Sequence, residues 1–227
     1  MEPMKIKGAI FDMDGTLVDS LFFWNFFWKS LGKRFLNQDD FVPAVEVDKH
    51  VRALNLHDSM QLVKDHYGIS EPVETLLAFA YEGLEDWYRN HAKVKDGVVS
   101  LLEHLKSLGI PMCVASATDI YYVRLALKHH GIAHYFDEII SCTEVGAGKD
   151  RPDVFLYTAK KMGLPAEDIC VFEDSFMAVE TAHNAGFLTV GIFDPYNNFE
   201  PARLRAASNL RVDEGQTMED LIPLITK

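Results

Sequence analysis

Short apolar runs separated by longer amphipathic segments form the main pattern of this chain. Buried β-strands are predicted where the chain is almost continuously apolar over a short stretch. These stretches are residues 5–12, 109–115, 168–172, 187–192 and, more weakly, 136–140. Helices are predicted between them, where apolar residues recur at helical spacing. These segments lie near residues 97–108, 119–130, 152–162 and 176–185. Strands that alternate with helices predict an α/β fold built on a parallel sheet.

Residues 18–93 interrupt this alternation. They hold only helix-like segments and fall between the first predicted strand and the next strand–helix unit. We therefore expect residues 1–17 and 94–227 to form one α/β core, with residues 18–93 as an inserted helical lobe. Both junctions of the lobe, near residues 15–19 and 91–97, lie beside two aspartates at the end of the first strand, which favours a movable cap.

Composition indicates a folded globular protein and narrows the choice of partners. The 227 residues are 48% hydrophobic and 25% charged, enough for one large core or a core with a modest second lobe. The formal net charge of −12 argues against binding to nucleic acid or to an anionic membrane, because like charges repel.

Cysteine usage and hydropathy indicate the compartment. Cys113, Cys142 and Cys170 are widely spaced and embedded in apolar runs, which fits buried reduced thiols better than disulfides or a zinc site. The start of the chain lacks the apolar core of a signal peptide, and no apolar run is long enough to span a membrane. We therefore expect a cytoplasmic protein.

The candidate chemistry centres on two aspartates at the end of the first strand. Asp12 and Asp14 follow the strand, and Gly15 allows the chain to turn sharply, which crowds both carboxylates into one pocket. Two carboxylates this close repel each other, so keeping both ionised requires a hard cation such as Mg2+. Taken alone, the same pattern is also typical of an Asx turn that ends a strand.

Polar side chains also lie at the ends of later strands. Ser116 and Ala117 follow the second strand, Glu173 and Asp174 follow the fourth, and Lys149 lies in a loop before a helix. Ligands of an open parallel sheet bind beyond the carboxyl ends of its strands, so these residues are expected to share one site with the aspartates. Hydroxyl, backbone N–H, ammonium and carboxylate groups together suit phosphoryl transfer. Each residue alone also fits a structural role, such as a helix cap or a solvated loop lysine.

Taken together, these segments resemble the haloacid dehalogenase superfamily, in the subgroup with a helical cap inserted after the first motif. Residues 11–19, Ser116, Lys149 and residues 173–175 are similar, in that order, to the family's four motifs. The resemblance spans the whole chain. It implies a Rossmann-like parallel sheet core with an inserted α-helical cap domain.

The resemblance also implies roles for individual residues. Asp12 would be the nucleophile that forms an aspartyl-phosphate, and Asp14 would protonate the leaving oxygen and then activate a water. Ser116, the adjacent Ala117 and Lys149 would bind the transferred phosphoryl group.

A magnesium site is implied by the same resemblance. Mg2+ would be held by the Asp12 carboxylate, the Asp14 backbone carbonyl and Asp174, with Glu173 in or near the coordination shell. The dehalogenases of the superfamily lack the second aspartate, since a halide leaving group needs no acid. Asp14 therefore favours phosphate-ester chemistry.

The predicted cap contains an unusually aromatic run at residues 21–29. One helix cannot direct all of these rings at a single partner, so some are expected to line a groove or an interface. The alternative is that the rings build the core of the cap and its contact with the sheet. In motif layout the chain is similar to the β-phosphoglucomutases, but Trp24 lies where those proteins carry a histidine, and their second phosphate clamp has no clear counterpart. Arg52 and Lys49 are the candidates to replace that clamp. We expect Trp24 and Arg52 to contact a substrate with an apolar or planar part.

The sequence thus predicts a Mg2+-dependent phosphatase of a small phosphomonoester, a monomer or homodimer without nucleic-acid or membrane partners. A sugar-phosphate mutase of the β-phosphoglucomutase type is the alternative enzyme, which a requirement for a sugar bisphosphate would reveal. A catalytically silent regulatory or binding protein on the same fold is the alternative from another class. The intact set Asp12, Asp14, Ser116, Lys149 and Asp174 argues against it.

Overall fold

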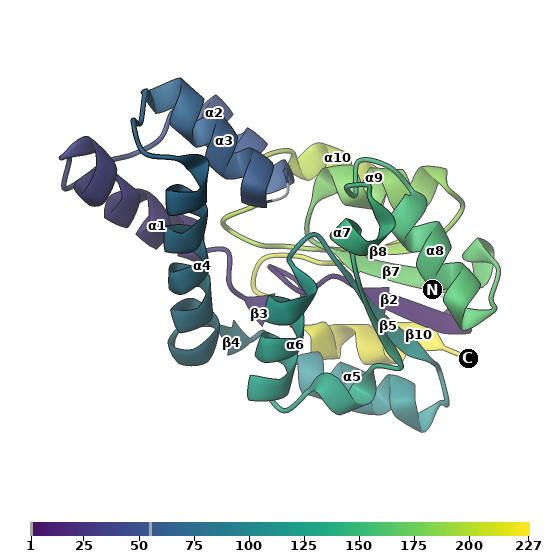
Figure 1. Cartoon of the computed structure of the whole chain (residues 1–227). Coiled ribbons are helices and arrows are strands. Elements are labelled where there is room, and N and C mark those ends of the chain that lie inside the picture. The colour runs from purple at the N-terminus through teal and green to yellow at the C-terminus, as the bar shows by residue number, and fades with distance from the viewer. Residues whose placement is uncertain (1, 55) are drawn as a thin grey trace. The chain divides into compact units, whose positions relative to one another are not determined.

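The structure is a computed structural model that describes residues 2–54 and 56–227, without the side chains of residues 52 and 53. It divides into two compact units. The first is formed by the chain up to Asp19 together with Lys93–Lys227, and the second by Ser20–Ala92. Figure 1 shows the order of the elements along the chain.

A parallel sheet forms the centre of the first unit. Within the described residues, its six strands are arranged in the order β6-β5-β2-β7-β8-β9. Their bounds are β2 Gly8–Phe11, β5 Met112–Ser116, β6 Glu138–Ser141, β7 Ile169–Glu173, β8 Leu188–Ile192 and β9 Leu210–Val212. Each strand pairs in parallel with its neighbours, and β2 lies between β5 and β7. The prediction of an α/β fold with a parallel sheet is confirmed.

Helices and short helical turns connect these strands. They are α5 Val98–Ser107, α6 Ile120–His129, η2 Ala133–Tyr135, α7 Cys142–Val145, α8 Asp153–Met162, η3 Ala166–Asp168, α9 Phe176–Asn184, α10 Pro201–Ala206 and η4 Met218–Leu224. Asp119 caps α6 by accepting a hydrogen bond from the Tyr121 N–H, at 2.9 Å. Gly163 ends α8 in the left-handed conformation that glycine adopts without strain.

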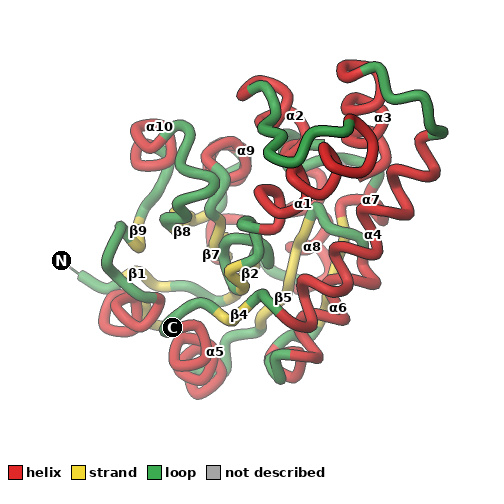
Figure 2. The backbone as a smooth tube through the Cα atoms, turned by 90° about the vertical axis from the view of Figure 1, so that its left-hand side faces the viewer, coloured by secondary structure: helices red, strands yellow, loops and turns green. Residues whose placement is uncertain are grey.

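The central strands are apolar because helices cover both faces of the sheet. Every residue of β2, β5 and β7 is buried. Helices α8 and α9 lie on one face and α5 on the other, so the strands lie between α9 and α5 in both views (Figures 1 and 2). Phe11 and Phe172 are registered partners on β2 and β7, and their rings stack with centroids 4.3 Å apart.

The first predicted strand, residues 5–12, is divided in the structure. Its start forms β1, Met4–Lys5, which pairs with β10, Ile225–Thr226. The Ile6 N–H still donates to Thr226, whereas the Lys7 N–H donates to the Asp168 carbonyl at 2.7 Å. The backbone therefore changes partners before β2 begins. The sixth strand, β9, was not predicted, because three residues carry no measurable periodicity.

The two linkers between the units pair with each other. Val18–Asp19 forms β3 and Lys93–Val94 forms β4, in an antiparallel register that joins Val18 to Val94 and Asp19 to Lys93. The sequence placed Val18, Asp19 and Lys93 in the insertion, whereas they cluster with the first unit. Backbone pairing between chain segments that leave and return side by side explains the difference.

The second unit is helical. Its elements are α1 Phe23–Leu31, the π-helical turn η1 Gly32–Leu36, α2 Val45–Ala53, α3 Leu56–Tyr67 and α4 Val73–Asn90. Phe23, Phe27 and Trp28 of α1 are buried, and the Trp28 indole N–H donates to Asp48 of α2 at 2.7 Å. Part of the aromatic run thus forms the core of this unit, as the sequence analysis allowed.

Two further expectations concern cysteines and hydropathy. Cys113, Cys142 and Cys170 are buried and free, as predicted. None of the helices that the structure describes has both the length and the apolar character needed to cross a bilayer.

Candidate active site

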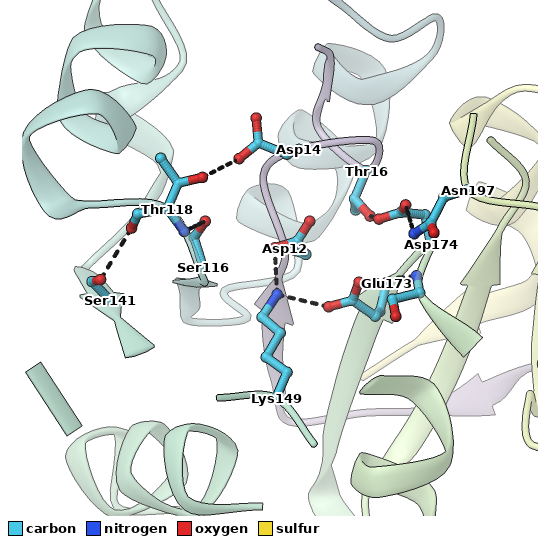
Figure 3. Close-up of polar contacts among 11 residues, drawn as sticks. Asp12, Asp14, Thr16, Ser116, Thr118, Ser141, Lys149, Glu173, Asp174 and Asn197 are labelled. Atoms are coloured by element: carbon cyan, nitrogen blue, oxygen red, sulfur yellow. Dashed lines mark hydrogen bonds and ion pairs between the residues drawn. The ribbon is translucent and has the colours of Figure 1, made fainter. Parts of the chain in front are cut away.

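The functional candidates from different strands converge at one edge of the sheet. Asp12 follows β2, Ser116 ends β5 and Glu173 ends β7, while Lys149 comes from the loop between α7 and α8 (Figure 3). Because these strands are parallel, their carboxyl ends open onto the same edge. Gly15, with φ of 82°, lets the chain turn back after β2, and this turn is closed by hydrogen bonds to the Met13 carbonyl.

Lys149 lies between two carboxylates at the centre of this site. Its ammonium group contacts the Asp12 carboxylate and donates to Glu173 Oε2 at 2.7 Å. The side chains of Lys149, Asp12 and Glu173 are only 9%, 7% and 2% exposed. Burial by itself would lower the pKa of Lys149, but the charges of Asp12 and Glu173 outweigh it and raise this pKa above its ordinary value. The two neighbouring carboxylates therefore favour the charged form of Lys149.

The two carboxylates that contact Lys149 belong to a cluster of three acidic side chains. One oxygen from each of Asp12, Glu173 and Asp174 lies within 4.8 Å of the others, and all three residues are buried. Burial, followed by the charge of Glu173, raises the pKa of Asp12 and of Asp174 well above the ordinary range. A single lysine does not balance three carboxylates. Crowded, buried, hard oxygen donors are what a divalent cation such as Mg2+ requires, so these residues fit that ion.

The third acid of this cluster, Asp174, is held from two sides. The Thr16 hydroxyl donates to its Oδ1 at 3.1 Å, and the Asn197 side-chain amide donates to its Oδ2 at 2.7 Å. Thr16 belongs to the turn after β2, and Asn197 to the loop after β8. Two donors on one carboxylate fix its orientation.

The Asp14 carboxylate lies apart from this cluster. Its Oδ2 accepts a hydrogen bond from the Thr118 hydroxyl at 2.8 Å, and Figure 3 shows it turned away from Lys149 and toward Thr118. The Thr118 N–H in turn donates to Ser116 Oγ at 3.1 Å, and the Ser141 hydroxyl donates to the Thr118 carbonyl at 3.0 Å. Thr118 thus links Asp14 to the phosphate-binding candidate Ser116. Ala117, the other candidate on this loop, is exposed.

Some of these contacts were not anticipated from the sequence. Thr16 and Thr118 lie next to predicted site residues, so a hydroxyl within a motif was the available signal. Asn197 lies 23 residues beyond Asp174 in a loop without a recognisable pattern, and nothing in the sequence indicates its role.

The two cap candidates belong to the second unit. Trp24 is half-buried, and its ring contacts Phe23, Phe27 and Trp28 within α1. The side chain of Arg52 lies outside the described residues. The expectation that Trp24 and Arg52 contact the substrate therefore stays a prediction.

Known proteins share this sequence pattern and this fold. A family model described as haloacid dehalogenase-like hydrolase matches residues 6–186. A Drosophila melanogaster protein named "Probable pseudouridine-5'-phosphatase" is 28% identical over 197 residues, which cover 84% of this chain and 83% of that protein. The Escherichia coli fructose-1-phosphate phosphatase YqaB is 27% identical over 198 residues, covering 83% and 97% of the two chains.

A solved structure shows the same fold over nearly the whole chain. CbbY from Rhodobacter sphaeroides, crystallised in complex with phosphate, superposes with a TM-score of 0.80 at 20% identity. The match covers 96% of this chain and 99% of that one. At this identity the similarity supports the fold alone.

Proposed function

Since the chain belongs to the haloacid dehalogenase-like hydrolase family, we propose that it is a Mg2+-dependent phosphatase of a small phosphomonoester. The observation that carries the proposal is the buried contact of Lys149 with Asp12 and Glu173, with Asp174 alongside. It combines a nucleophile, a cation for phosphoryl oxygens and a set of hard metal ligands in one place. The presence of Asp14 favours an ester over a halide, because an alkoxide leaving group needs a proton.

In the first step, an Asp12 carboxylate oxygen attacks phosphorus and the bond from phosphorus to the ester oxygen breaks. Asp14 gives its proton to that oxygen, so the alcohol leaves neutral. Lys149 offsets the negative charge of the phosphoryl oxygens. The Ser116 hydroxyl already accepts the Thr118 N–H, so its own proton is available for a phosphoryl oxygen, and the exposed Ala117 supplies a backbone N–H.

In the second step, a water attacks phosphorus and the bond between phosphorus and Asp12 breaks. Asp14, now ionised, takes the proton of the water, and phosphate leaves while the Asp12 carboxylate is regenerated. The Thr118 hydroxyl holds the Asp14 carboxyl group in place throughout, because it can donate to an oxygen of that group in both steps. Every atom and charge of the starting site is thereby restored.

The magnesium ion would be held by the Asp12 carboxylate, Asp174 and the Asp14 backbone carbonyl, with Glu173 in or near the shell. When bound, it supplies positive charge that keeps Asp12 ionised despite burial. Thr16 and Asn197 orient Asp174 for this role.

We also propose that the unit Ser20–Ala92 acts as the cap that excludes water while the phosphoenzyme forms. Its linkers, β3 and β4, pair with each other immediately after the turn that carries Asp12 and Asp14. The two relatives are named as phosphatases of a nucleoside phosphate, with the word probable in its name, and of a sugar phosphate. This supports a small phosphorylated metabolite as the substrate class.

The proposal is tested by measuring phosphate release from a panel of phosphomonoesters with and without Mg2+. The panel contains pseudouridine 5'-phosphate, fructose 1-phosphate, other nucleotides and sugar phosphates. Release that is lost in Asp12→Asn and in chelator, but retained in Asp150→Asn, is the expected result. Asp150 is a matched control because it is an exposed aspartate next to Lys149.

Two outcomes would contradict the proposal, the first its mechanism and the second its reaction. Undiminished release by Asp12→Asn would exclude the aspartyl-phosphate. Turnover that requires a sugar bisphosphate and yields an isomerised sugar phosphate would identify a mutase instead.

The contribution of the aromatic helix to substrate choice is tested by Trp24→Ala. If Trp24 contacts an apolar or planar part of the substrate, KM should rise for such esters and change little for small polar ones, while the Mg2+ requirement stays the same. Phe26→Ala is the control, because Phe26 lies on the same helix and is 49% exposed. An identical substrate profile for both variants and the wild type would refute the contact.

A further inference from the structure

The second linker carries a lysine with contacts that the proposed chemistry does not use. Lys95 follows β4, and its ammonium group donates to the Gly15 carbonyl at 2.7 Å, the Phe193 carbonyl at 3.0 Å and Asp194 Oδ2 at 3.1 Å. The Lys95 side chain is 18% exposed and that of Asp194 only 1%. One cation thus joins the turn after β2 to the loop after β8.

The loop after β8 forms a compact turn. The Tyr196 N–H donates to Asp194 Oδ1 at 2.8 Å, and the Asn197 N–H donates to the Asp194 carbonyl at 3.2 Å. These hydrogen bonds within the loop fix the position of Asn197 relative to Asp194.

The two turns meet again at Asp174. Thr16, next to Gly15, donates to one oxygen of this carboxylate, and Asn197 donates to the other. The contacts therefore close a ring. It runs Gly15, Thr16, Asp174, Asn197, Asp194, Lys95 and back to Gly15.

We propose that Lys95, Asp194 and Asn197 are positioning residues for the magnesium site. Lys95 sets the spacing of the two turns that grip Asp174, and Asn197 sets the angle of the carboxylate. Lys95 and Asn197 are not themselves metal ligands, yet both determine the affinity of the site for Mg2+. The inference rests on the proposed function, because it takes Asp174 to be a magnesium ligand.

This ring of contacts can change metal affinity, because it includes the partners that orient a proposed metal ligand. Partners behind a metal ligand commonly change metal affinity by about 10–100-fold when they are removed, because the ligand loses its fixed orientation. Asp174 follows the last residue of β7, so strand pairing does not hold it in place. The orientation of this carboxylate must therefore come from Thr16 and Asn197, and their own placement from Lys95.

Asn197 is tested first, with binding of Mg2+ to the full chain measured by isothermal titration calorimetry. Asn197→Ala should weaken Mg2+ binding by about tenfold or more. Asn198→Ala is the matched control, because Asn198 is the exposed neighbour in the same loop, and it should bind as the wild type does. With phosphatase activity present, kcat of Asn197→Ala at saturating Mg2+ should stay near the wild-type value while the Mg2+ concentration for half-activation rises.

Lys95 is tested with a pair of variants, because Lys95→Met alone leaves the Asp194 carboxylate buried without its cation. Lys95→Met/Asp194→Asn removes both charges and keeps the oxygen that accepts the Tyr196 N–H. This double variant should unfold thermally near the wild-type temperature, yet bind Mg2+ about tenfold more weakly. Lys93→Met, which changes an exposed lysine of the same linker, should leave the affinity unchanged.

The outcomes separate this inference from the proposed function. Wild-type Mg2+ affinity in Asn197→Ala, or in the folded double variant, would overturn the positioning role. Wild-type protein that binds Mg2+ but releases no phosphate would contradict the phosphatase. The Mg2+ affinities of the variants, compared with that of the wild type, would still decide whether the ring positions Asp174. Wild-type protein that binds no Mg2+ would overturn the positioning role together with the metal site.

Discussion

The charge balance of the site makes a strong prediction for Lys149→Met in metal-free protein. Lys149 is the cation in contact with Asp12 and Glu173, and all three side chains are at most 9% exposed. Removing one partner of a buried ion pair costs about 3–5 kcal/mol, because the remaining charge is left without compensation. For a protein of this size, that cost lowers the unfolding temperature by roughly 6–20 °C.

The assay is thermal unfolding in chelator near neutral pH. Lys160→Met is the matched control, since it removes an exposed lysine of α8 and should change the unfolding temperature only slightly. Saturating Mg2+ should restore part of the loss, because the ion supplies positive charge to the same carboxylates.

A third variant separates charge from packing. Adding Glu173→Gln to Lys149→Met removes one of the uncompensated charges, so the double variant should unfold at a higher temperature than Lys149→Met alone. Two results would refute the reasoning. The first is a loss in Lys149→Met no larger than in Lys160→Met, and the second is no recovery on adding Glu173→Gln.

Three further predictions use other contacts of the structure. Thr118→Ala should lower kcat roughly tenfold, the equivalent of about 1.4 kcal/mol, because Asp14 loses its hydrogen bond. In steady-state kinetics the kcat of Thr118→Ser should stay near the wild-type value, and an equal loss of kcat in both variants would contradict the role of the hydroxyl. Burial, then the charge of His129, holds the pKa of His130 below its ordinary 6.5. The unfolded chain therefore binds the extra proton first, so stability should fall as pH drops below about 6.5, and urea unfolding of His130→Gln should show a weaker dependence. Mg2+ at a hundred times its Kd should raise the free energy of unfolding by about 2.7 kcal/mol. This stabilisation should vanish in Asp174→Asn, and stabilisation that persists in that variant would exclude Asp174 as a ligand.

Much of the fold was readable from the chain because the relevant signals are local. Continuous apolar runs and helical periodicity identify the buried strands and their connecting helices, and the rules for parallel sheets then bring the strand ends to one edge. Asp12, Ser116 and Glu173 were placed at one site by this argument alone. The family model confirms the resemblance seen in the motifs.

Short or divided elements escaped the same reasoning. The pairs β1 with β10 and β3 with β4 have two residues in each strand, and their existence depends on a partner that lies far away in the sequence. Strand β9, with the sequence Leu-Arg-Val, is defined by its pairing with β8 rather than by its own pattern.

Side-chain direction was decided only by tertiary structure. The sequence indicates that Asp12 and Asp14 lie close together, but the Thr118 hydroxyl turns the Asp14 carboxylate away from the acidic cluster. A rotamer depends on which hydrogen-bond donor lies within reach, and this donor comes from the loop after a different strand, β5.

The sequence by itself determined that the core is a parallel sheet, at which edge of it the site lies and which residue types carry charge there. Tertiary structure alone decided which groups, distant in the sequence, hold those charged side chains in place. Asn197 reaches Asp174 over 23 positions and Lys95 reaches Asp194 over 99, because the pairing of β7 with β8 and of β3 with β4 brings their loops together. Hydrogen bonds act over a few ångströms and demand direction, so such contacts leave no periodic trace along the chain.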